Sequence, residues 1–212
     1  MLNLLIALAG TALQTAAVAS PAPAAAPSPT VGRTLSGLPN VAIKYYDVPG
    51  KDEKAIQKNL KKLRTNPQTK AFSAADSNWN VDVSVQKTTT NGKCVITGIT
   101  SRFSGSVELP RLADERVLTP AALANWRNYA GGLERAIADN FYFVYDQLPA
   151  MEKTVIGQEC TKAVDIWTSG MDRLKAAASE NARQAAAAAA AADAAAAAAA
   201  KAKAKEDPKA KN

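Results

Sequence analysis

Residues 79–110 carry the pattern that most restricts the fold of this chain. Residues 79–85 alternate strictly between apolar and polar side chains, and this period of two is typical of a half-buried β-strand. Asn91-Gly92 follows, which is the strongest short-range signal for a β-hairpin turn. The return strand spans residues 93–110 and ends at a proline. The sequence therefore predicts a long antiparallel hairpin within a sheet.

A strand and a basic helix precede the hairpin. Residues 41–48 are rich in β-branched and aromatic side chains, which predicts a strand that ends at a Pro-Gly turn. Residues 53–64 predict a helix, because Asp52 and Glu53 place negative charge at its start and its apolar residues share one face. Four lysines lie on the opposite face: Lys54, Lys58, Lys61 and Lys62. This basic face is either solvated or an anchor to an acidic lipid or polymer.

Two helices are predicted after the hairpin. Thr119 and Pro120 fit the N-cap and the first helical position, and apolar side chains then keep helical spacing as far as Leu148. Pro149 interrupts this pattern, and a second apolar helix is predicted over residues 151–174. Strands followed by helices indicate an α+β domain. We therefore expect an antiparallel sheet of three or four strands packed on a C-terminal helix pair, followed by an alanine-rich tail.

The segments outside this domain point to export. Residues 1–19 combine an apolar run with small residues that end at Ala19, which predicts a secretory signal peptide; an uncleaved membrane anchor is the alternative. Residues 20–39 form a Pro/Ala-rich linker. The folded domain is expected over residues 40–175, and residues 176–212 form an Ala/Lys-rich low-complexity tail. We expect the mature protein to be periplasmic or secreted.

The chain has only two cysteines, Cys94 and Cys160, in a predicted strand and a predicted helix. An even number of cysteines in an exported chain favours a disulfide, which would clamp the sheet to a helix. Closing a loop of this length stabilises a fold by about 4 kcal/mol in the chain-entropy model. Two unpaired buried thiols are the alternative.

The formal net charge is +7, and it limits the partners of the chain. The basic residues gather in the lysine-rich helix and in the C-terminal tail, and neither segment has the interleaved aromatic residues of a nucleic-acid platform. We therefore expect no nucleic acid as partner. An anionic component of the cell envelope suits an exported basic protein better.

Histidine is absent from the whole sequence, and this excludes several kinds of catalysis. Zinc sites with histidine ligands, Ser-His-Asp and Cys-His arrangements, and histidine acid/base chemistry are all ruled out. A catalyst that uses carboxylates alone remains open. Its candidates lie near the end of the hairpin: Glu108, Asp114 and Glu115.

The helix that begins at Thr119 contains an unexpected pair of glycines, Gly131 and Gly132. Each glycine in a helix interior costs about 1 kcal/mol of stability relative to alanine. A helix with an otherwise strong apolar pattern therefore needs a reason to carry both.

A resemblance to a known family supplies such a reason. Four segments carry it: the Tyr-Tyr-Asp-Val strand with its Pro-Gly turn, the Trp-Asn-Val strand, the Cys-containing hairpin that ends in Leu-Pro, and the tryptophan-led helix. In order and spacing they resemble a bacterial family of predicted secreted zinc-dependent proteases, domain of unknown function 922. The family's helix has a His-Glu-x-Gly-His motif, in which two histidines four residues apart bind zinc and the glutamate is the general base.

The resemblance implies that this motif is lost here. Tyr129 and Leu133 stand at the two histidine positions, Ala130 stands at the position of the base, and Gly132 matches the motif glycine. A later Asp-x-x-Thr-x-His segment of the family has Gly170 in place of its histidine. Gly132 would then be inherited from a motif in which small size mattered.

The function that follows is a catalytically inactive homologue, a binding or scaffold module in the cell envelope without cofactor or metal. A cleft between the hairpin and the helix pair would hold an extended peptide, and Asn128, Tyr129 and the hairpin edge would line it. The alternative is an active hydrolase that uses carboxylates or non-standard metal ligands.

Overall fold

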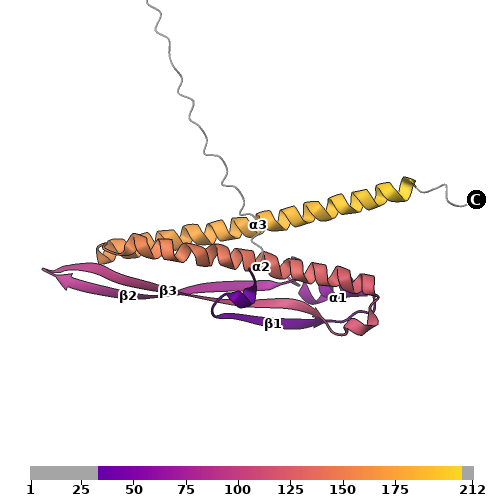
Figure 1. Cartoon of the computed structure of the whole chain (residues 1–212), viewed down its shortest axis with the longest axis horizontal. Coiled ribbons are helices and arrows are strands. Elements are labelled where there is room, and N and C mark those ends of the chain that lie inside the picture. Colours follow the sequence, from indigo (N-terminus) through magenta and orange to yellow (C-terminus); the bar gives the residue numbers. More distant parts are fainter. Residues whose placement is uncertain (1–32, 207–212) are drawn as a thin grey trace, which may run out of the picture. The chain divides into compact units, whose positions relative to one another are not determined.

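The computed structural model of the chain describes residues 33–206, with side chains up to residue 188 (Figure 1). The expected signal peptide, residues 1–19, lies outside the described residues, and so does most of the expected linker, residues 20–39. Both therefore stay predictions.

Three strands and three long helices make up the described domain. In chain order they are β1 (Val41–Val48), α1 (Glu53–Arg64), β2 (Asp76–Thr90), β3 (Lys93–Leu112), α2 (Pro120–Val155) and α3 (Cys160–Glu206). Two short 3₁₀ helices, η1 (Leu35–Gly37) and η2 (Glu115–Val117), precede β1 and α2. The helix pair α2 and α3 packs on the sheet, which confirms the expected α+β class.

The sheet has the strand order β1-β3-β2, with β3 in the centre. β2 and β3 form the expected antiparallel hairpin, and its turn residues Asn91 and Gly92 have the positive φ angles, 51° and 73°, that such a turn requires. β1, however, pairs with β3 in parallel, so the expectation of a purely antiparallel sheet was wrong and the sheet is mixed. The chain reverses direction once through α1 and once at the hairpin turn, and two reversals leave β1 and β3 pointing the same way.

α2 begins where the sequence predicts, with the Thr119 hydroxyl accepting a hydrogen bond from the Ala122 amide. The predicted break at Pro149 was wrong, because α2 continues through this proline to Val155. Leu148 and Val155 are buried on either side of Pro149. Packing therefore holds the helix together across a residue that removes one backbone hydrogen bond. The chain leaves the helix only at Gly157, where φ is 81°.

The main core lies between the sheet and the helix pair. The rings of Phe103 on β3 and Phe141 on α2 meet edge to face at its centre, with centroids 5.6 Å apart. Buried residues of η1, β3, α2 and α3 surround them: Leu35, Leu38, Val107, Leu109, Ala138, Val144, Leu148, Leu174 and Ala178.

Two smaller cores flank the main one. The second core joins α1 to the ends of β1 and β3 and to the start of α2, through Val48, Ile56, Leu60, Ala74, Leu112 and Trp126. The third core joins the start of β3 to the link between α2 and α3, through Ile96, Val155 and Ala163. The second core is the one that shapes the candidate site.

The disulfide between Cys94 and Cys160 confirms the expected pairing. Cys94 lies near the start of β3 and Cys160 begins α3, with their Cα atoms 5.4 Å apart. Backbone bonds reinforce this link, because Gly157 N–H donates to the Ile96 carbonyl and Ile96 N–H donates to the Gln158 carbonyl. The bond clamps the sheet to the helix pair beside the third core.

α3 continues without interruption across the expected domain boundary at residue 175. Ala178 lies beyond that boundary and is buried in the main core, so the start of the alanine-rich segment takes part in packing. The role of residues 176–212 as a separate tail stays a prediction. Across residues 33–206, no helix has the length and apolar character needed to cross a membrane.

Candidate functional site

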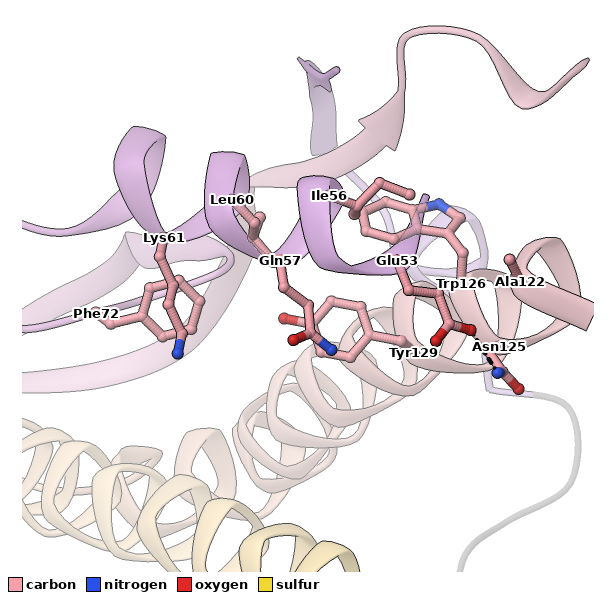
Figure 2. Close-up of a pocket in the computed structure, with 10 residues that line it drawn as sticks. All are labelled: Glu53, Ile56, Gln57, Leu60, Lys61, Phe72, Ala122, Asn125, Trp126 and Tyr129. Atoms are coloured by element: carbon pink, nitrogen blue, oxygen red, sulfur yellow. Dashed lines mark hydrogen bonds between the residues drawn. The ribbon is translucent and has the colours of Figure 1, made fainter. Parts of the chain in front are cut away.

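A pocket of about 370 Å³ opens between α1 and the first turns of α2 (Figure 2). Its walls come from α1, from the loop that follows α1, and from the start of α2: Glu53, Ile56, Gln57, Leu60, Lys61, Phe72, Ala122, Asn125, Trp126 and Tyr129. Apolar and aromatic side chains form most of this surface, with polar groups along α1 and at Asn125. Such a mixture is typical of sites that bind small organic groups or single side chains.

Local capping and packing hold the two helices in place around the pocket. The Asp52 carboxylate caps α1 by accepting a hydrogen bond of 2.8 Å from the Ala55 amide. On the pocket side, the Asn125 amide Nδ2 donates to Glu53 Oε1 at 2.7 Å and ties α2 directly to α1. Ile56 of α1 is buried in the second core. The pocket is therefore built on two anchored helices.

The residues at the expected motif positions divide between the pocket and the core. Tyr129 lines the pocket with 40% of its surface exposed, and its ring lies 5.8 Å from that of Trp126 (Figure 2). Ala130 packs against the second core, and Leu133 packs against both the main core and the second core. The first histidine position thus faces a pocket, and the second lies in an apolar interior. Their assignment to a lost zinc motif stays a prediction.

Gly170 lies far from these positions. It lies beside Met151 of α2, and a Cβ atom at Gly170 would come within 2.9 Å of the Met151 Cε atom. Met151 lies roughly 27 Å beyond Leu133 along the axis of α2, at about 1.5 Å of rise per residue. The structure therefore does not bring Gly170 together with Tyr129 and Leu133.

Gly131 and Gly132 have no packing requirement for glycine, because a Cβ atom added at either position meets nothing within 4 Å. We expect Gly131→Ala and Gly132→Ala each to raise the free energy of unfolding by up to about 1 kcal/mol, as alanine lowers the entropy lost on helix formation. Urea unfolding measures the change. Gly157→Ala is the control that should lose stability instead, because its φ of 81° is strained for any residue with a Cβ atom. A loss of stability in Gly131→Ala or in Gly132→Ala would contradict the expectation.

Sequence reasoning missed an ionic cluster behind the pocket. Arg64, at the end of α1, donates a hydrogen bond of 2.8 Å from Nη1 to Glu108 Oε2. It also forms an ion pair with Asp76, and its side chain is only 15% exposed. Its guanidinium lies 4.9 Å from the ring centre of Tyr46, whose hydroxyl donates to the Ala74 carbonyl. These residues come from α1, β1, β2 and β3, so no sequence spacing connects them.

Burial raises the pKa of the Tyr46 phenol to about 12. The Arg64 charge acts in the opposite direction and lowers this pKa, while Tyr129, Glu108 and Asp76 raise it further. Tyr46 therefore remains protonated at neutral pH and acts as a hydrogen-bond donor. The cluster as a whole binds α1 to the sheet and so supports one wall of the pocket.

The three candidate carboxylates are each paired with a different arginine. Glu108 pairs with Arg64, Asp114 with Arg116, and Glu115 with Arg127. The Arg116 side chain and backbone hold the pKa of the Asp114 carboxyl below its usual value. Within the part of the chain that the structure describes, no three histidine, cysteine, aspartate or glutamate side chains are grouped to hold a metal ion.

The pocket also differs from the expected cleft. Asn128 and the hairpin edge were expected to line one cleft together with Tyr129, but neither lines the pocket that Tyr129 faces. A separate apolar pocket of about 170 Å³ opens between the hairpin and the helix pair, with Val85, Ile99 and Trp167 among its lining residues. In the pocket that Tyr129 faces, α1 forms the opposite wall, through Gln57 and Lys61, and Phe72 comes from the following loop. The apolar face of α1 was evident from the sequence, but its partner across the chain was not.

Fold and pocket together define a mixed-sheet α+β domain with an apolar-aromatic pocket between its first helix and its long second one. The model of the family described as "Bacterial protein of unknown function (DUF922)" matches residues 43–207, and the chain belongs to this family. No curated protein and no solved structure matches the chain.

Proposed function

We propose that this chain is an exported, non-catalytic member of its family that binds an extended peptide segment in the pocket between α1 and α2. The observation that supports this most is the position of Tyr129. It stands where the resemblance places the first zinc-binding histidine, and it lines a pocket rather than the core. A site once shaped for a peptide substrate would keep its shape when its ligands are replaced by side chains that pack.

The residues around the pocket argue against peptide hydrolysis. The chain has no histidine, and Ala130 has no group that can accept a proton from water. Leu133 is apolar and partly buried between two cores. Glu108, the candidate carboxylate on β3, is engaged by Arg64. A zinc-bound water therefore has no histidine ligands here, and Glu53, held at Oε1 by the Asn125 amide, is the carboxylate that lines the pocket.

Peptide is the ligand that best suits the surface. Apolar walls from Leu60, Phe72 and Trp126 can bury a side chain, and the amide groups of Gln57 and Asn125 can bond to a backbone beside them. A volume of about 370 Å³ holds one or two side chains rather than a folded partner.

Two features support a location outside the cytoplasm. The sequence predicts a signal peptide over residues 1–19, and the fold contains the Cys94–Cys160 disulfide. Disulfides form and persist in oxidising compartments such as the periplasm. An envelope location also places the protein among the extended segments of other exported chains.

Fluorescence anisotropy tests the proposal with a labelled, uncharged peptide, Ala-Leu-Phe-Ala amide, and the purified mature protein. We expect saturable binding that weakens at least ~10-fold in Tyr129→Ala, because a buried aromatic contact is typically worth more than about 1 kcal/mol. Tyr45→Ala is the matched control, since Tyr45 is an exposed tyrosine outside the pocket. The same protein should contain no stoichiometric zinc and should not cleave casein.

Three results would overturn the proposal. Cleavage that a chelator abolishes and zinc restores would mean that the chain is a metalloenzyme. Cleavage without metal that is lost in Glu53→Gln or in Glu108→Gln would favour the carboxylate hydrolase. Absence of binding, or equal binding by Tyr129→Ala and wild type, would remove the pocket as the site.

A further inference from the structure

Three polar side chains form a row along the pocket side of α1. Glu53, Gln57 and Lys61 follow one another at intervals of four residues, so they share one face of the helix. Figure 2 shows all three extending from α1 toward the same side, with Tyr129 opposite Gln57 and Phe72 beside Lys61. At about 1.5 Å of rise per residue, the row spans roughly 12 Å.

The two ends of this row carry opposite charges. At one end, Glu53 is held in place by the Asn125 amide, which contacts only Oε1 and leaves Oε2 without a hydrogen bond in the described part of the chain. At the other end, the Lys61 ammonium makes no ion pair or hydrogen bond with any described residue. Gln57 between them is neutral. The row therefore presents a negative end and a positive end to whatever enters the pocket.

Apolar surface lies between the charged ends. The ring of Tyr129 lies opposite Gln57 and the ring of Phe72 lies beside Lys61, while Ile56, Leu60 and Trp126 complete the apolar lining. An extended peptide advances about 3.3 Å per residue, so the row of roughly 12 Å matches three to four residues. The opposite charges of the row, its length and the apolar lining beside it together fit one short extended peptide.

We propose that the pocket selects a dipolar extended segment of about four residues, with an acidic side chain at Lys61, a basic side chain at Glu53 and two apolar residues between them. This inference rests on the proposed peptide binding and adds its specificity. Lys61 acts as the specificity-determining residue, because it is the one lysine of α1 that lines the pocket. The remaining lysines of this helix, Lys54, Lys58 and Lys62, are exposed outside it.

Five amidated peptides of one length test the proposal by fluorescence anisotropy with the mature protein. They are neutral (Ala-Leu-Phe-Ala), dipolar in either order (Asp-Leu-Phe-Lys and Lys-Leu-Phe-Asp), doubly acidic (Asp-Leu-Phe-Asp) and doubly basic (Lys-Leu-Phe-Lys). Wild type should bind one dipolar order about fivefold more tightly than the neutral peptide, the size expected for one or two exposed ion pairs. The doubly basic peptide should bind less tightly than the neutral one.

A charge reversal at Lys61 distinguishes a direct contact between Lys61 and the peptide from the long-range effect of the net charge of α1. Lys61→Glu should make the doubly basic peptide the tightest of the five. Lys62→Glu changes the net charge by the same amount outside the pocket and should leave the wild-type ranking in place. Both positions are exposed, so thermal melts of the variants should match wild type.

The outcomes distinguish the two proposals. Equal affinity for all five peptides, lost in Tyr129→Ala, would overturn the charge selection and leave peptide binding intact. The same shift in Lys62→Glu as in Lys61→Glu would assign the preference to long-range charge and overturn the role of Lys61. Failure of every peptide to bind would overturn the proposed function itself. A reversed ranking confined to Lys61→Glu supports the inference.

Discussion

Reduction of the Cys94–Cys160 disulfide is expected to lower the free energy of unfolding by about 4 kcal/mol in the chain-entropy model. The bond joins residues that are 66 positions apart, so it removes a large loop from the unfolded ensemble. It also lies beside the third core, which has only Ile96, Val155 and Ala163 as buried members. Apart from this small core, two backbone hydrogen bonds of Ile96 to residues 157 and 158 hold the start of β3 beside the helix pair.

Urea unfolding with and without a reductant measures this loss. The variant with Cys94→Ser and Cys160→Ser should match the reduced wild type, and addition of reductant to that variant should change nothing. The slope of the unfolding curve should rise in the reduced form, because an unfolded chain without the cross-link exposes more surface. A loss below about 1 kcal/mol would mean that the unfolded state retains the contact between the hairpin and the helices.

The elements that sequence reasoning predicted correctly depend on local patterns. The Asn91-Gly92 turn requires positive φ angles that these two residue types tolerate, and the structure has the turn there. α1 and the start of α2 follow from capping residues and helical spacing, and both begin where they were expected. The disulfide was also predictable, because the chain offers only one possible pair of cysteines.

Features that depend on distant contacts were not predictable in this way. The parallel pairing of β1 with β3 depends on where α1 returns the chain, and no residue in β1 encodes its neighbour. Pro149 carries a strong local signal for a break, and burial of Leu148 and Val155 overrides it. In both cases tertiary packing decides between alternatives that the local sequence leaves open.

The candidate site depends both on local sequence patterns and on contacts between distant residues. The resemblance assigns Tyr129 to a motif position, and this assignment stays a prediction. The structure shows that Tyr129 lines a pocket between α1 and α2. The opposite wall of this pocket did not follow from the sequence, because Glu53 and Asn125 are 72 residues apart and meet through a single side-chain bond. Arg64 and Glu108 are likewise distant in sequence and hold α1 against the sheet. A pocket between two helices needs the helix positions before its lining can be named.

Phe141→Ala is expected to lower the free energy of unfolding by about 3–5 kcal/mol, as large-to-small changes of buried aromatic residues do. The Phe141 side chain is completely buried and packs edge to face on Phe103 in the main core. Its removal would leave a cavity between β3 and α2 that neither rigid element can close. Urea unfolding of the oxidised protein measures the loss, and Tyr145→Ala on the same helix is the control, since Tyr145 also meets the Phe103 ring but is partly exposed.

Gly105 of β3 lies directly against the Phe141 ring. A Cβ atom at Gly105 would lie 2.5 Å from the Phe141 Cε2 atom, and all of the nearest atoms there belong to the same ring. Gly105→Ala alone should therefore lower stability by about 1–3 kcal/mol through overpacking. In the double variant the alanine methyl group enters the space that the ring leaves, so the combined loss should fall below the sum of the single losses by at least about 1 kcal/mol. Additive losses would mean that the close approach of β3 to α2 does not depend on this ring.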